Sequence, residues 1–220
     1  MIINEEFKEA TLRFDEVEKR GSFYWMAVNL IRNGFEIEAY LLTLATWGFA
    51  SFRYAVKDFD ISVFRDKIRE LDPHFVKMED ENFRTIDFNR YEADIKEIFE
   101  TLSQIKGVQF TNASKIMHLK NRDVFLMWDR YIAGLKPQKY YNQLDIVRSG
   151  FWRSVEYRGA DGYFQFLKNM QSRFESISFQ HSEKTFAKAV DEFNFVKITL
   201  PIQQMEKNER KRRVRVRGSS

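Results

Sequence analysis

The residues best suited to chemistry lie around a tight turn near Gly107. Residues 102–117 read as a helix, a turn of about five residues and a second helix, so the first N–H groups of the second helix lack acceptors inside that helix. The helix dipole is positive at the same end. The basic side chains in and just after this segment are Lys106, Lys115, Lys120 and Arg122, with no acidic residue between 106 and 122. A nucleic-acid phosphate is the natural ligand. The alternative is an ordinary helix–helix corner with solvated lysines.

A longer stretch of the chain, from Gly107 to Asp129, carries a recognisable motif. Its elements are, in order, Gly107-Val108, Ala113 and the run Val124-Phe-Leu-Met-Trp-Asp129. In that order and spacing the chain resembles the helix-hairpin-helix superfamily of base-excision DNA glycosylases, which includes enzymes like endonuclease III and 8-oxoguanine DNA glycosylase. In that superfamily a hairpin of the type Gly-Val-Gly-Pro-Lys-Thr-Ala leads into a helix, and an apolar stretch then ends in an Asp. The resemblance implies that duplex DNA contacts Lys106, Gly107, Val108, Gln109, Thr111, Lys120 and Arg122.

The chain departs from the superfamily pattern at two positions. Gln109 stands where the second hairpin glycine is usual, and a side chain forced into a left-handed conformation costs on the order of 1 kcal/mol. Thr111 stands where the lyase-type members carry a nucleophilic lysine, and threonine cannot form a Schiff base. The resemblance therefore favours a monofunctional glycosylase, in which water is the nucleophile.

Lys115 is the alternative nucleophile. It lies four residues after Thr111 on the same helix face, and side chains of a helix lean toward its N-terminus. Its amine would then approach the position of the superfamily's lysine. The competing interpretation is a lysine that contacts a DNA phosphate or only solvent.

Asp129 is the candidate catalytic carboxylate that the resemblance implies. Cleavage of an N-glycosidic bond builds positive charge on the sugar, and a carboxylate stabilises that charge and can orient a water molecule. The competing interpretation is a capping residue for a helix that begins at Arg130, a role worth roughly 1 kcal/mol. The two roles are compatible, because a cap fixes the carboxylate in one place.

A glycosylase also needs a pocket for the base that it turns out of the helix. The candidates for its wall are Trp47, Trp128 and His118. Each has an ordinary alternative, because a chain with 22 Phe and 4 Trp must bury most of its aromatic side chains. For His118 that alternative is a hydrogen-bonded interior histidine.

The elements that position these residues are predicted to be helices. The chain has 220 residues, of which 44% are hydrophobic, with only 9 Gly and 3 Pro, too few for a protein of many tight turns. Apolar residues recur at three- and four-residue steps. They predict helices near 4–20, 22–33, 36–57, 60–71, 90–104, 111–120, 130–134, 161–177 and 181–197.

We therefore expect an all-α fold in one domain over residues 1–200, a two-lobed helical bundle with a cleft between the lobes. The lobe boundary is placed near 72–90, in a connection that contains Pro73, and the helix-hairpin-helix at 92–120. Residues 201–220 are predicted to be a basic, flexible tail.

The charge is distributed unevenly along the chain. Residues 1–103 carry 14 basic and 21 acidic side chains, whereas residues 104–158 carry 10 and 4. A polyanion is therefore expected to bind the middle of the chain. The absence of Cys and three scattered His predict no metal site and no cofactor. With no apolar run near the roughly 20 residues that span a bilayer, we expect a soluble intracellular monomer, cytoplasmic, at the nucleoid or nuclear, without a membrane partner.

The sequence as a whole favours a DNA repair glycosylase that excises a damaged or mismatched base. Two alternatives remain open. The first is a noncatalytic DNA-binding protein that keeps the hairpin, and the second is a helical scaffold whose acidic first half binds a basic partner.

Overall fold

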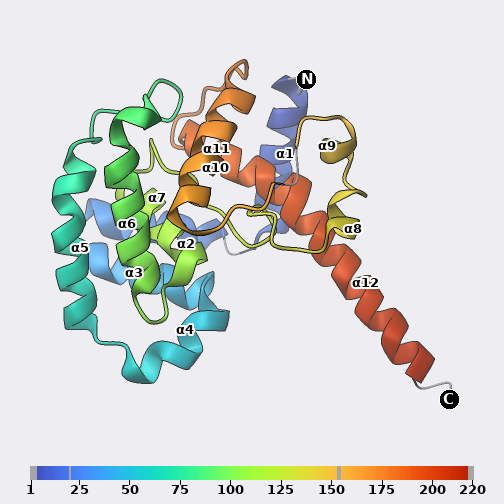
Figure 1. Ribbon diagram of the computed structural model, residues 1–220, viewed down its shortest axis with the longest axis horizontal. Coiled ribbons are helices and arrows are strands. Elements are labelled where there is room, and N and C mark those ends of the chain that lie inside the picture. Colours follow the sequence, from blue (N-terminus) through green and yellow to red (C-terminus); the bar gives the residue numbers. More distant parts are fainter. Residues whose placement is uncertain (1–3, 20, 153–154, 218–220) are drawn as a thin grey trace.

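The computed structural model consists of helices, with no strand in the parts of the chain that it describes, residues 4–19, 21–152 and 155–217 (Figure 1). The all-α class predicted from the sequence is confirmed. The α-helices are α1 (Asn4–Val17), α2 (Gly21–Arg32), α3 (Glu36–Thr46), α4 (Phe49–Ala55), α5 (Ile61–Val76), α6 (Glu92–Gln104), α7 (Gln109–Lys120), α8 (Gln138–Tyr141), α9 (Asp145–Arg148), α10 (Gly159–Phe174), α11 (Phe186–Asn194) and α12 (Leu200–Arg217). Two short 3₁₀ segments, η1 (Val56–Asp58) and η2 (Phe88–Tyr91), and a π-helical segment, η3 (Phe195–Thr199), complete the list.

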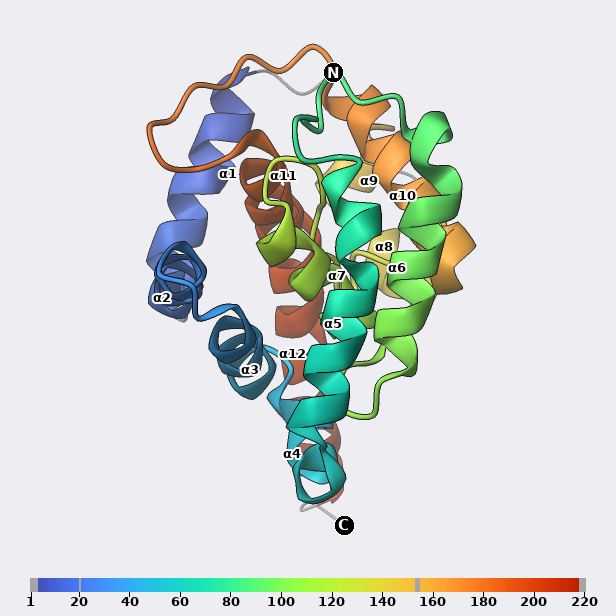
Figure 2. The ribbon, with the colours of Figure 1, turned by 90° about the vertical axis from the view of Figure 1, so that its left-hand side faces the viewer.

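The helices enclose one core. Figure 2 shows α5, α6 and α7 side by side, and the apolar stripe of α6, namely Ile95, Ile98, Phe99 and Leu102, is buried as its spacing predicts. The buried apolar side chains of the described residues form a single continuous cluster, so the division into two lobes with a cleft between them stays a prediction. None of the described helices is both long and apolar enough to cross a membrane.

The single helix predicted for 36–57 is wrong, because the chain bends at Trp47-Gly48 and continues as α4 and η1. The bend brings Gly48 against α7. A Cβ atom at Gly48 would lie 2.3 Å from the Asn112 side-chain nitrogen, so a larger residue there would displace the buried amide of Asn112. The predicted helix at 130–134 is also absent, and this segment forms hydrogen-bonded turns.

The connection predicted to start near Leu71 starts later, because α5 continues through Pro73 to Val76. Pro73 costs this helix one backbone hydrogen bond. The helix persists because Leu71 and Phe75, on either side of the proline, are both buried in the core.

Most of the segment predicted as a tail, residues 201–220, forms α12, which runs from Leu200 to Arg217, and residues 218–220 lie outside the described residues. The apolar spacing did not predict this helix, because α12 has no long apolar face. Only its first turns pack against the core, where Ile202 is buried. Further along, Glu206 pairs with Lys136. The remainder is rich in Glu, Lys and Arg, which are intrinsically good helix formers.

The turn between α6 and α7 has the geometry that its glycine suggests. Gly107 has φ +90°, and Gln109 has φ +57°, the one positive value for a residue other than glycine among the described residues. The strain expected for Gln109 is therefore present. The turn rests on α4, since a Cβ atom at Gly107 would lie 2.9 Å from that of Ala55 and 3.2 Å from the Phe52 ring.

We predict that Gly107→Ala destabilises the protein more than Gly34→Ala does. Both glycines have similar positive φ, but nothing lies within 4 Å of a Cβ atom at Gly34. The backbone strain, about 1 kcal/mol, is common to both variants. Overpacking against Ala55 adds about 1–3 kcal/mol for Gly107 alone. Urea unfolding measures both, and equal losses would contradict the close contact.

Candidate functional site

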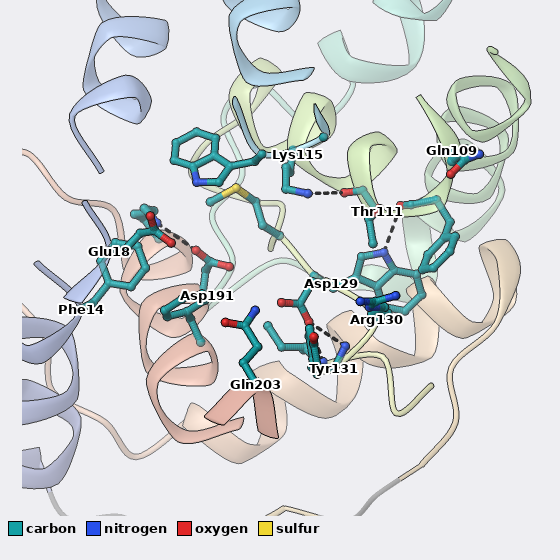
Figure 3. Close-up of a pocket in the computed structure, with 18 residues that line it drawn as sticks. Phe14, Glu18, Gln109, Thr111, Lys115, Asp129, Arg130, Tyr131, Asp191 and Gln203 are labelled. Carbon is teal, nitrogen blue, oxygen red and sulfur yellow. Dashed lines mark hydrogen bonds and ion pairs between the residues drawn. The ribbon is translucent and has the colours of Figure 1, made fainter. Parts of the chain in front are cut away.

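A cavity of about 510 Å³ lies where α1, α7, α11 and α12 meet the segment 127–132 (Figure 3). Its wall includes several of the residues predicted to be functional: Trp47, Gln109, Thr111, Lys115, Trp128 and Asp129. These residues come from three separate parts of the chain. The volume lies in the range typical of sites for small molecules or single groups of a larger ligand.

The Asp129 carboxylate is held by three hydrogen-bond donors. Its Oδ1 accepts from the backbone N–H groups of Tyr131, at 2.8 Å, and Ile132, at 2.9 Å. Its Oδ2 accepts from the Thr199 hydroxyl at 2.8 Å. Asp129 thus caps the turn that follows it and also lines the cavity, so both roles considered for it are compatible with its position.

The surroundings of Asp129 alter its acidity. Burial raises the pKa of the Asp129 carboxyl above its ordinary value, although the donors Ile132, Thr199 and Tyr131 and the charge of Lys115 all act in the opposite direction. A carboxylate with a raised pKa is a better proton acceptor than an ordinary aspartate. The site therefore combines a fixed position with increased basicity.

Lys115 leans toward the N-terminus of α7, as its place in the helix predicts. Its Nζ donates to the carbonyl oxygen of Thr111 at 3.2 Å and to the Asn112 side-chain oxygen at 3.3 Å. Figure 3 shows the amine above the first turn of α7, with Asp129 on the other side of the cavity. The cavity thus has a cation on one wall and an anion on another.

The two tryptophans differ in what they offer to a ligand. Trp128 is almost fully buried and belongs mainly to the core, where its ring packs edge-on against Phe99 and Tyr163. Its indole nitrogen donates to the carbonyl of Phe110 at 3.1 Å. Trp47 is only half-buried at the cavity wall. Trp47 is therefore the aromatic surface better placed for stacking.

His118 does not line the cavity, so the structure does not bring it together with Trp47 and Trp128. The ring is fully buried, with Nδ1 2.6 Å from the Phe125 carbonyl and Nε2 2.9 Å from the Tyr24 hydroxyl. A carbonyl only accepts, so Nδ1 carries the proton and Nε2 accepts from Tyr24. Burial lowers the pKa of His118 to about 3 and keeps the ring neutral. It is the interior histidine of the alternative interpretation.

The residues expected to bind DNA do not form one surface. Lys120 pairs with Glu36 at 2.6 Å and Asp72 at 2.7 Å, and Arg122 donates to the Tyr24 hydroxyl at 3.1 Å. Lys120 is the last residue of α7 and Arg122 comes two positions later, roughly 16 Å from the turn. Their contacts tie helices together, and the structure does not bring them together with the turn near Gly107.

The residues of the turn also differ in their surroundings. Lys106 is exposed and pairs with Asp58 of η1, while the Val108 side chain is buried. Gln109 and Thr111 line the cavity. The first turn of α7 is therefore the part of this segment that directly adjoins the cavity.

A second group of charged residues in the wall escaped the sequence analysis. Lys188 and Asp191 of α11 pair at 2.9 Å, and both line the cavity with Glu18. Although burial acts to lower it, the nearby charges of Asp191 and Glu192 raise the pKa of Lys188. The signal in the sequence is a lysine and an aspartate three residues apart on a helix whose other residues are mostly apolar.

We predict that His118 makes the protein less stable in acid. Unfolded, its pKa is near 6.5, whereas the folded protein holds it near 3. The unfolded state therefore binds the proton first, and the stabilisation that is complete above pH 6.5 is lost as the pH falls. Between pH 7.5 and 5.0 this costs about 2 kcal/mol. Urea unfolding at both pH values should show a correspondingly weaker dependence in His118→Gln, and an unchanged dependence would contradict a buried neutral ring.

Comparison with known protein families, with curated proteins and with solved structures finds no match to this chain.

Proposed function

We propose that the protein is a DNA glycosylase that excises a damaged or mismatched base from duplex DNA. The observation that supports this most directly is the Asp129 carboxylate, fixed by three donors on the wall of a cavity of about 510 Å³. A single base fits into that volume. The resemblance of residues 102–132 to the helix-hairpin-helix glycosylases supports the same activity.

Asp129 provides the charge that the reaction needs. As the N-glycosidic bond breaks, positive charge develops on the sugar, and a carboxylate already held in position stabilises it without reorganising. The same carboxylate accepts a proton from the attacking water molecule, a task that its raised pKa favours. Neither role requires a metal ion.

The wall of the cavity suits a base that has left the DNA double helix. Trp47 offers an aromatic face on which a base can stack. Gln109, Asp191 and Gln203, all labelled in Figure 3, offer polar groups that can read the edge of the base. Which base is accepted depends on how these groups are arranged around it.

The first turn of α7 is the proposed contact with the DNA backbone. The start of a helix favours an anion through its dipole and its first N–H groups, and Lys115 adds a positive charge beside this turn. Because Gln109 and Thr111 line the cavity, a phosphate bound at this turn lies next to the nucleotide whose base enters the cavity. The turn and the cavity would then act on the same stretch of DNA.

We predict that Asp129→Asn abolishes base release. The variant keeps the size of the side chain and an oxygen that can accept hydrogen bonds, but it loses the charge, which should lower the rate at least about 100-fold. A panel of duplexes, each with one lesion, is scored for abasic sites. Asp145→Asn is the control, because that carboxylate is fully exposed on α9.

The outcomes of this experiment separate the candidate functions. Base release that survives in Asp129→Asn excludes the proposed mechanism. Duplex binding without any base release in the unmodified protein indicates a noncatalytic DNA-binding protein. If the protein does not bind duplex DNA in a salt-sensitive way, both DNA functions are excluded and the helical scaffold is the remaining candidate.

We also predict that Lys115 forms no covalent intermediate. Its amine is engaged with Thr111 and Asn112, and water serves as the nucleophile. Borohydride added during turnover should trap no protein–DNA adduct. Lys115→Arg, which keeps the charge but cannot form a Schiff base, should release base within a few-fold of the unmodified rate. A trapped adduct that disappears in Lys115→Arg would establish a lyase instead.

A further inference from the structure

The charge of helix α12 changes along its length, from mixed acidic and basic residues to basic residues alone. Its two acidic residues are both engaged: Glu206 with Lys136 and the Tyr131 hydroxyl, and Glu209 with Lys139 and the Tyr140 hydroxyl. After Glu209 the sequence has no acidic residue up to its last position. The next four residues, all basic and all exposed, are Arg210, Lys211, Arg212 and Arg213.

This basic part of α12, residues 210–213, stands clear of the other helices. Figure 1 shows the last turns of α12 extending away from the body of the protein. Among the described residues, no ion pair is formed by Arg210, Lys211 or Arg212. The positive charge here is therefore directed at solvent, unlike that of Lys136 and Lys139.

The same helix begins at the cavity. Thr199, which precedes α12, donates to Asp129, and Gln203 lines the cavity wall. With a rise of about 1.5 Å for each residue, Arg210 lies roughly 15 Å along the helix from Leu200. At about 3.4 Å for each base pair, that distance corresponds to roughly four to five base pairs of duplex.

The chemistry of residues 210–213 favours phosphate groups over a membrane. Successive residues of a helix are rotated by about 100°, so four consecutive basic residues surround its axis and leave no apolar face. Among the described side chains of α12, Val214 is the one large apolar side chain that is exposed, whereas helices that bind membrane surfaces need a continuous apolar face. A helix with charge on all sides can face the phosphates on both edges of a DNA groove.

We propose that residues 210–213 form a cationic arm that binds the backbone phosphates of duplex DNA several base pairs from the base held in the cavity. This rests on the proposed function, because it assigns the flanking duplex to the same substrate. The pairs that Glu206 and Glu209 make with Lys136 and Lys139 neutralise the acidic part of α12 and fix the direction of the arm.

The test removes the charge of the arm and leaves the helix. In the triple variant Arg210→Gln, Lys211→Gln, Arg212→Gln, glutamine keeps nearly the helix propensity of arginine and lysine. The matched control changes Arg65, Lys67 and Arg69 of α5 to glutamine, which removes the same charge from a helix on the other side of the molecule (Figure 1). Circular dichroism checks that both variants keep their helix content.

The measurement is the salt dependence of binding to a duplex of about 30 base pairs. Each phosphate contact contributes about 0.9 to the slope of log Kd against log salt concentration. We expect the slope of the arm variant to fall by about 2 to 3, and that of the α5 variant to remain unchanged. On a duplex of about 8 base pairs centred on the lesion, the unmodified protein and the arm variant should bind alike.

Several results would overturn the proposal. An unchanged slope in the arm variant, or an equal fall in the α5 variant, excludes a specific arm. Binding to vesicles of anionic lipid that the arm variant loses, without a change in duplex binding, assigns the arm to a membrane instead. Base release by the unmodified protein together with an unchanged slope refutes the arm alone, whereas failure to bind any duplex refutes the proposed function as well.

Discussion

The Asp129 carboxylate joins two parts of the chain that lie 70 positions apart in the sequence. One oxygen closes the turn at Tyr131 and Ile132, and the other accepts from Thr199 at the junction of η3 and α12. Because a partly buried charge must be compensated, the turn and the helix junction have to meet at this point. The cavity lies beside the meeting point, so its shape depends on the same three hydrogen bonds. Tyr131, whose hydroxyl reaches Glu206 of α12, reinforces the connection.

Local patterns of the sequence predicted much of the fold. The spacing of Ile95, Ile98, Phe99 and Leu102 located α6, and the glycine at 107 located the turn after it. Asp129 was singled out because the resemblance to the helix-hairpin-helix glycosylases implies an aspartate after the apolar run 124–128, and the structure places this residue on the cavity wall. At Pro73 the apolar spacing favours a helix, whereas proline favours its end. The helix continues because Phe75 is buried in the core, and that burial depends on the whole fold.

The candidate site was only partly predictable, because it depends on contacts between distant residues. Lys120 and Arg122 follow the turn closely and carry the right charge, but their partners, Glu36 and Tyr24, lie more than 80 positions earlier. The burial of His118 likewise depends on a distant residue, Tyr24, whose hydroxyl contacts its ring. Asp191 and Glu18 reach the cavity through the packing of α11 on α1, which no periodicity reveals. The uneven charge of the sequence overstated the positive surface, since lysines of the middle segment pair with glutamates of α12.

The π-helical segment η3 gives the junction its particular geometry. Each of its turns holds an additional residue, so the helix that follows is re-phased by about 100° relative to an uninterrupted α-helix. The apolar stripe of α11 can therefore stay in the core while, only a few positions later, Thr199 reaches Asp129 and Gln203 lines the cavity. In evolutionary terms, insertion of one residue into a continuous helical rod is enough to change which of its faces meets Asp129. A small change in chain length can thus install or remove a carboxylate's partner.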